Sequence, residues 1–158
     1  MKKFKVRFFE ILCLVFLAVF IFNVTQGETY STKTVADVES SVLEIFPTKD
    51  LKKIEKNKLK EEFSFDFDQI DSFSYYASDS IMVVNELLII KLKPDVNSTD
   101  VERQILERLG KKQVLFEGYA PNESALLQNY VLKSASGFVF YAVGEQAQKS
   151  LEMFLSVV

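Results

Sequence analysis

The chain has 158 residues, 48% of them hydrophobic, with a formal net charge of −3 at pH 7, which indicates a folded domain and argues against nucleic acid as a partner. Histidine is absent, which excludes the commonest general base, the commonest transition-metal ligand and any histidine-based catalytic triad. A single cysteine excludes an intramolecular disulfide and a thiolate metal site.

The N-terminus combines a cluster of cations with an apolar run. The cations are Lys2, Lys3, Lys5 and Arg7. Residues 11–24 follow and would span about 21 Å as a helix, whereas residues 8–24 would span about 26 Å of a hydrocarbon core of about 30 Å. We predict that residues 1–27 form a basic cytoplasmic tip and a signal anchor, with the C-terminal domain outside the cell membrane. The alternative is a signal peptide cleaved near Gly27, which would release a secreted protein.

Residues 28–33 are polar and predict a short linker, and residues 34–158 are long enough for one domain. Thr34 and Asp37 predict the capped start of a helix, which Pro47 would end. The helix is indicated by apolar residues at spacings of three and four, namely Val35, Val38, Val42, Ile45 and Phe46.

A second helix is predicted over residues 50–60, where lysines alternate with a few apolar residues. The lysines favour a solvated helix face, and the alternative is an electrostatic docking strip. Directly afterwards, Phe63, Phe65 and Phe67 alternate with polar residues, which predicts a half-buried strand.

Two extended segments are predicted at residues 81–84 and 86–93. The run of apolar residues at 87–90 indicates a central strand covered on both faces. Thr99 and Glu102 then form a capping box for a further helix. Its inner face would carry Val101, Ile105, Leu106 and Leu109.

The C-terminal third predicts a short helix beginning at Pro121, a β-hairpin and a final helix. The hairpin strands would be residues 130–133 and 138–143, joined by residues 134–137. The final helix would present an apolar face made of Ala147, Leu151, Phe154 and Leu155.

The order strand, strand, helix occurs around residues 72–113 and again around 129–157, which indicates a duplication. We therefore predict an α+β fold, a two-layer sandwich of one antiparallel sheet with helices on one face.

Four segments of the chain, residues 34–38, 76–82, 85–91 and 116–121, resemble a Gram-positive bacterial family, the domain of unknown function 4358. The resemblance extends over residues 34–156. It implies an extracytoplasmic, often membrane-tethered domain with no assigned activity and no accepted catalytic residues. Many relatives resemble lipoproteins, but here Cys13 precedes most of the apolar core, so a usable lipidation signal is lacking.

Hydroxyls, carboxylates and aromatic rings gather near one predicted strand end, where they could hold a sugar or a peptide. The candidate binding residues are Tyr75, Tyr76, Ser78, Asp79, Ser80 and Glu86. The alternative is a turn in which Asp79 and the serines cap backbone groups while Tyr75 fills the core. Carboxylates at Asp66, Asp68 and Asp71 do not follow calcium-loop spacing, so no metal site and no cofactor are predicted.

These observations predict an extracytoplasmic binding or adaptor module of the cell envelope, attached to the membrane through residues 8–24. Its partner would be an envelope protein, a peptide or a glycan. One alternative is a carboxylate-dependent glycan hydrolase, which would need two of Asp66, Asp79 and Glu86 in one cleft. Another is a structural subunit of a membrane complex. The sequence favours a protein that is not an enzyme.

Overall fold

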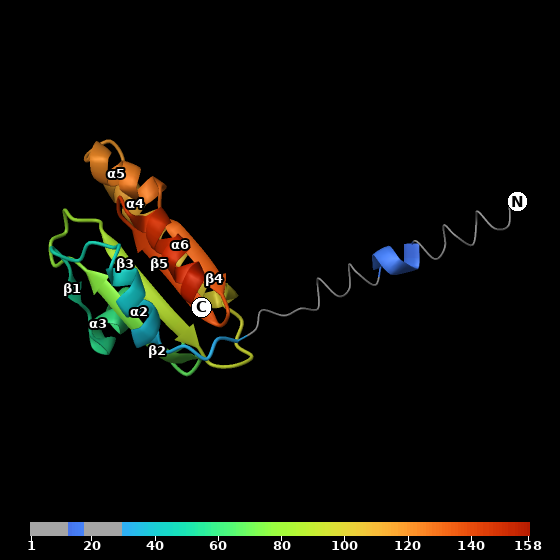
Figure 1. The fold of residues 1–158 in the computed structure, drawn as a ribbon. Helices are drawn as coiled ribbons and strands as arrows, with labels where there is room; N and C mark the ends of the chain where they lie inside the picture. The colour runs from blue at the N-terminus through green and yellow to red at the C-terminus, as the bar shows by residue number, and fades with distance from the viewer. Residues whose placement is uncertain (1–12, 18–29) are drawn as a thin grey trace, which may run out of the picture.

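A five-stranded antiparallel sheet forms the centre of the computed structural model, which describes residues 13–17 and 30–158 (Figure 1). Its spatial order is β1-β2-β3-β5-β4, and every neighbouring pair is antiparallel. The strands are β1 (Lys52–Lys53), β2 (Ile70–Ala77), β3 (Glu86–Leu92), β4 (Val131–Ala135) and β5 (Phe138–Val143).

The predicted anchor or signal peptide lies mostly outside the described residues and stays a prediction. Residues 13–17 are helical. Within residues 13–17 and 30–158, no helix combines the length and the hydropathy needed to cross a bilayer.

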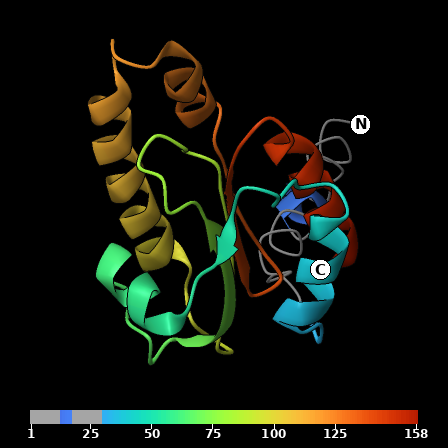
Figure 2. The same cartoon turned by 90° about the vertical axis from the view of Figure 1, so that its left-hand side faces the viewer.

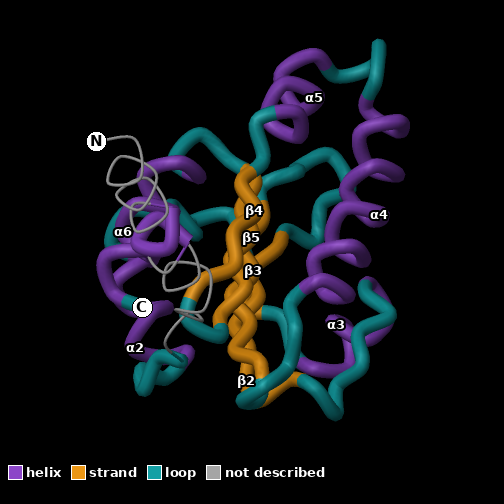
Figure 3. Tube along the Cα trace, turned by 90° about the vertical axis from the view of Figure 1, so that its right-hand side faces the viewer, coloured by secondary structure: helices purple, strands orange, loops and turns teal. Residues whose placement is uncertain are grey.

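Helices cover both faces of the sheet (Figures 2 and 3). They are α2 (Val35–Leu43), α3 (Lys56–Glu62), α4 (Thr99–Phe116), α5 (Pro121–Gln128) and α6 (Ala147–Val157). The α+β class and the antiparallel sheet are confirmed, but the prediction of helices on one face is wrong. Every residue of β3 and β5 is buried, and because successive side chains of a strand point to opposite faces, both faces need a cover.

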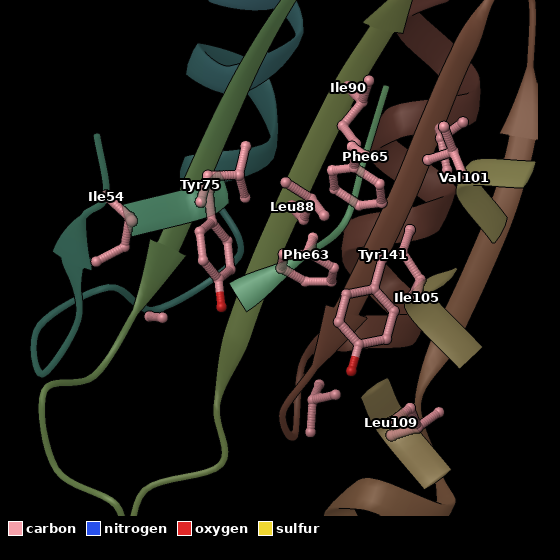
Figure 4. Close-up of a cluster of buried hydrophobic side chains, with 14 of the residues drawn as sticks. Ile54, Phe63, Phe65, Tyr75, Leu88, Ile90, Val101, Ile105, Leu109 and Tyr141 are labelled. Atoms are coloured by element: carbon pink, nitrogen blue, oxygen red, sulfur yellow. The ribbon is translucent and has the colours of Figure 1, made fainter. Parts of the chain in front are cut away.

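Each face has its own hydrophobic core. On one face, Leu88 and Ile90 of β3 pack with Val101, Ile105 and Leu109 of α4 (Figure 4). On the other face, Leu87 and Ile89 of β3 and Phe140 of β5 pack with residues of two helices. These are Val38 and Val42 of α2 and Phe154 of α6. Burial of each such side chain stabilises the fold by about 1.5–3 kcal/mol.

The repeated order of elements is present, as β2-β3-α4 and β4-β5-α6, but it is not a rotational repeat. The first strand of one unit, β2, is antiparallel to the first strand of the other, β4. The step from β2 to β3 and the step from β4 to β5 also run in opposite directions across the sheet. A rotation with that effect has its axis perpendicular to the sheet and would keep both helices on one face. Because α4 and α6 lie on opposite faces, the repeat is one of element order only.

The segment before β2 differs from the sequence prediction. The predicted helix over residues 50–60 begins only at Lys56, because Lys52 and Lys53 pair with the end of β2. Buried Ile54 continues this pairing by donating its backbone N–H to the carbonyl of Tyr75 at 2.7 Å.

The predicted strands at residues 63–67 and 81–84 are also wrong. Phe63 and Phe65 are buried and their rings stack 4.6 Å apart, but their segment is a loop with no strand partner. Residues 81–84 form a turn, in which the N–H of Val83 donates to the carbonyl of Ser80.

Two predictions that rest on local sequence signals, at a helix start and at a turn, are confirmed. The capping box of Thr34 and Asp37 at the start of α2 is confirmed. The hairpin turn is confirmed too, with positive φ at Ser136 and Gly137, although it has two residues rather than four. In α4 the cap is Ser98 rather than Thr99, and the Ser98 hydroxyl donates to Glu102.

The last residues of the predicted linker are docked on the domain. The Tyr30 hydroxyl donates to the carbonyl of Leu92 at 2.7 Å, and the N–H of Ser31 donates to the carbonyl of Ser136 at 2.9 Å. The Tyr30 ring covers Gly137 so closely that a Cβ there would lie 2.6 Å from two ring carbons. We call this arrangement of residues 30–31 against Leu92 and residues 136–137 the N-terminal clamp.

Candidate functional site

A solvent-open cavity of about 350 Å³ lies between the β2–β3 loop, residues 78–85, and the C-terminal half of α4. We call it the cleft. Ser78, Asp79 and Ser80, three of the candidate binding residues, line its rim, and Arg108 and Lys112 line it from α4.

Beneath the cleft lies the fully buried carboxylate of Glu86. It accepts hydrogen bonds from Arg108 Nη1 at 2.8 and 3.0 Å and from Lys112 Nζ at 3.0 Å. The Tyr141 hydroxyl donates to it at 2.7 Å, and that of Tyr75 lies 3.0 Å away. A buried carboxylate needs such partners, because an unpaired charge in the interior is strongly destabilising.

Arg108 joins this carboxylate to a second one. Its Nη2 contacts Glu62 and also donates to the Tyr75 hydroxyl at 3.1 Å. Its guanidinium group lies over the ring of Phe63, 4.6 Å from the centroid. We call the connected side chains of Glu62, Tyr75, Glu86, Arg108, Lys112 and Tyr141 the Glu86 network.

Strand register assembles the network. Leu88 of β3 pairs with both Tyr75 of β2 and Tyr141 of β5, so the two tyrosines share a face with Leu88 and, two residues earlier, with Glu86. Both hydroxyl groups point toward the same end of the sheet (Figure 4). Arg108 and Lys112 are four residues apart, which places them on one face of α4.

The network keeps Glu86 charged and both tyrosines neutral. Burial alone would raise the pKa of Glu86, but the charges of Arg108 and Lys112 and the Tyr141 hydrogen bond outweigh it, so the pKa is lowered. Burial, together with the charge of Glu86, raises the pKa of Tyr75 and of Tyr141. At neutral pH the carboxylate of Glu86 is therefore ionised, and the hydroxyl groups of Tyr75 and Tyr141 keep their protons.

The rim is held by polar contacts of its own. Asp79 pairs with Lys52 and, at 3.1 Å, with Lys58, and hydrogen bonds from these lysines lower its pKa. The Ser78 hydroxyl accepts from the N–H of Ser80, and the Ser80 hydroxyl accepts from the N–H of Met82. The two serines thus act as turn residues, which is the alternative that the sequence analysis gave for them. Among residues 13–17 and 30–158, neither O–H group donates to another group.

The six predicted site residues fall into three places. Ser78, Asp79 and Ser80 lie at the rim, and Tyr75 and Glu86 lie in the buried network. Tyr76 lies on the opposite face, where its hydroxyl donates to Glu39 at 2.6 Å and where burial and that carboxylate raise its pKa to about 12. The six residues therefore do not share one surface, because Tyr75 and Tyr76 are successive residues of one strand, and a binding role for any of them stays a prediction.

Sequence reasoning missed the other members of the site, namely Glu62, Arg108, Lys112 and Tyr141. A signal for two of them was present. Arg108 and Lys112 lie beside Ile105 and Leu109 on the face of α4 that packs on the sheet. They are therefore charged residues on a face that is otherwise apolar.

Exposed apolar side chains border the cleft. In the β2–β3 loop, Ile81 is 88% exposed, and Met82 and Val83 are also exposed. Ile81, Val83 and Phe116 line the cavity itself. Among residues 13–17 and 30–158, no group of three or more acidic or sulfur ligands is arranged to hold a metal ion.

The fold and the site together define a three-layer α+β domain with an open cleft above a buried ion-pair network. Residues 46–144 match the model of the family described as Domain of unknown function (DUF4358), and the chain belongs to this family. The match contains the whole Glu86 network and the cleft. No curated protein and no solved structure matches the chain.

Proposed function

We propose that the protein is an extracytoplasmic binding module of the bacterial cell envelope, membrane-anchored or secreted through residues 1–27, which holds its ligand in the cleft. The observation that carries this proposal is the exposed apolar rim formed by Ile81, Met82 and Val83 beside an open cavity. Apolar side chains gathered at a cavity mouth favour an interaction site, because their exposure is unfavourable until a partner covers them.

The buried network supports binding rather than chemistry. A glycosidase needs a carboxylic acid with a raised pKa and a second carboxylate across the substrate. The pKa of Glu86 is lowered instead, and Glu86 and Glu62 both contact Arg108. Asp79, the carboxylate at the rim, is engaged by Lys52 and Lys58. Among the described residues, the three carboxylates at this cleft are thus each engaged by cations, which favours binding over the alternative of a carboxylate-dependent hydrolase.

The test is photo-crosslinking in native membranes with the full-length protein. A photoreactive residue replaces Ile81 at the cleft, and the matched control replaces Leu155, which is also an exposed aliphatic residue but lies on α6, across the sheet. Mass spectrometry then identifies the adducts. We expect a reproducible adduct from position 81 only. Equal labelling from both positions, or none from position 81, would contradict the proposal.

The same experiment separates a binding module from a structural subunit of a membrane complex. Residues 1–27 are replaced by an unrelated anchor, and the crosslink at position 81 is measured again. A binding module keeps its adduct, because the cleft lies entirely in the domain. Loss of the adduct would favour a subunit whose N-terminal segment makes the contacts.

A further inference from the structure

We propose that the ligand in the cleft is a peptide whose free C-terminal carboxylate binds Lys112 and whose apolar last side chain packs on Ile81, Val83 and Phe116. This inference rests on the proposed function and names the ligand class of that same site. Two features carry it, which are the hydrogen-bond donors left over at the cleft floor and the aliphatic walls above them.

Lys112 is the donor with spare capacity. An ammonium group has three hydrogens, and within the described part of the chain that of Lys112 donates to Glu86 Oε2 alone, at 3.0 Å. Arg108, by contrast, already contacts Glu62, Glu86 and Tyr75. The Lys112 side chain is 25% exposed and lines the cavity, so its ammonium group is partly desolvated there.

The charges around the cleft favour an anion. Within the Glu86 network, two carboxylates balance Arg108 and Lys112. At the rim, Asp79 is shared by Lys58, which lines the cavity, and by Lys52, which lies outside the lining and supplies the one positive charge in excess. A carboxylate entering the cleft meets this excess positive charge and the O–H groups of the rim serines.

The walls fit an aliphatic side chain better than a sugar ring. Ile81, Val83 and Val84 line the cavity from the loop, and Phe116 lines it from α4. The two tyrosines near the floor are buried, so Phe116 is the one aromatic residue among the described residues that line the cavity. A carboxylate beside an aliphatic group is the chemistry of a peptide C-terminus with an apolar last residue.

The test uses two probes that differ only in charge, acetyl-Ala-Ala-Leu with a free C-terminus and the same peptide as its C-terminal amide. Each is titrated into the full-length protein in detergent micelles, and the Ile81 methyl resonance is followed by NMR. We expect saturable binding of the free acid at least about tenfold tighter than the amide, since a hydrogen bond to a charged group contributes about 1.5–3 kcal/mol.

Variants locate the effect. Lys112→Met keeps the apolar stem and removes the charge, so the acid should lose its advantage over the amide. Lys111→Met is the matched control on the neighbouring exposed residue and should keep the advantage. If Lys112→Met does not fold, Ile81→Ala is used instead, because it leaves the Glu86 network intact. This variant should weaken the binding of both peptides by a similar factor. Binding to it is followed at the Val83 methyl resonances.

The outcomes distinguish the two proposals. Equal binding of acid and amide would overturn the carboxylate inference and leave the binding function standing. Binding of N-acetylmuramic acid in place of either peptide would overturn the peptide in favour of a glycan. If no probe binds but position 81 gives a crosslink, the peptide inference is overturned and the binding function stands. If no probe binds and position 81 gives no crosslink, both proposals are overturned.

Discussion

Glu86 contacts side chains from two neighbouring strands and from one helix, and none of its surface reaches solvent. Glu86→Gln keeps the shape of the side chain but removes the charge that faces Arg108 and Lys112. We expect the free energy of unfolding to fall by about 3 kcal/mol, because removing one partner of a buried ion pair leaves the other uncompensated. Urea unfolding of the full-length protein measures this change.

The control is Glu107→Gln. Glu107 also pairs with an arginine, Arg103 at 2.6 Å, but both side chains are more than half exposed. Exposed pairs contribute little, so the change should stay below about 0.5 kcal/mol. Similar losses in the two variants would mean that burial of the Glu86 network does not matter for stability.

The lowered pKa of Glu86 predicts a dependence of stability on pH. A carboxyl group whose pKa is lower in the folded state stabilises the fold above its unfolded pKa of about 4.3, and this contribution is lost as the pH falls through the folded value. The stability advantage of the wild type over Glu86→Gln should therefore shrink below about pH 4. Urea unfolding at a series of pH values tests this, and a difference that stays constant down to pH 2 would contradict it.

At the scale of single elements, the start of α2 makes a local prediction. The Thr34 hydroxyl accepts from the N–H of Asp37, while the Asp37 carboxylate accepts from the N–H of Thr34. Thr34→Ala should lower the free energy of unfolding by about 1 kcal/mol. Ser40→Ala in the same helix is the control, which should be neutral or slightly stabilising because alanine is the better helix former. Equal effects of both variants would show that the capping box is without influence.

Elements with strong local signals were predictable from the sequence. Unbroken apolar runs identified β3 and β5, Ser136-Gly137 identified the hairpin, and Thr34 identified the start of α2. The short strand β1 was not predictable, because Lys52 and Lys53 have no apolar pattern and become extended only by pairing with β2. Phe63 and Phe65 alternate like a strand, but their burial comes from packing and not from a sheet partner.

The site was predictable only in part, and the reason is distance along the chain. Glu86 and Asp79 were named, since they lie near a visible strand end. Arg108 lies 22 residues from Glu86 and Tyr141 lies 55 residues from it, so their contacts depend on register and on which face α4 covers. The sequence-based prediction placed all helices on one face, and it was wrong because an apolar stripe on a helix does not say which side of the sheet it packs against.

At the scale of the whole molecule, the N-terminal clamp couples the entry of the chain to the hairpin turn. Gly137 has φ +82°, and the Tyr30 ring fills the space where a side chain would lie. Gly137→Ala should lower the free energy of unfolding by about 2 kcal/mol, through backbone strain and through loss of the Tyr30 hydrogen bond.

A double-mutant cycle separates the two terms. In a Tyr30→Ala background the ring is gone, so Gly137→Ala should lower the free energy of unfolding by only about 1 kcal/mol of backbone strain. Urea unfolding of the four proteins measures the coupling. Additive effects would show that Tyr30 and Gly137 do not interact in the folded protein.

The clamp also fixes Tyr30 at the end of β3 that lies opposite the cleft. Strand β3 begins at Glu86 beneath the cleft and ends at Leu92, where Tyr30 is bound, so the six steps along its seven residues separate the two by about 20 Å. A chain held in a membrane by its first 27 residues, as proposed, reaches the described domain at Tyr30, beside the Leu92 end of β3 and remote from the cleft at Glu86. Under that proposal we expect the opening to point away from the bilayer, so that a ligand on the wall side would reach it without passing the lipid headgroups.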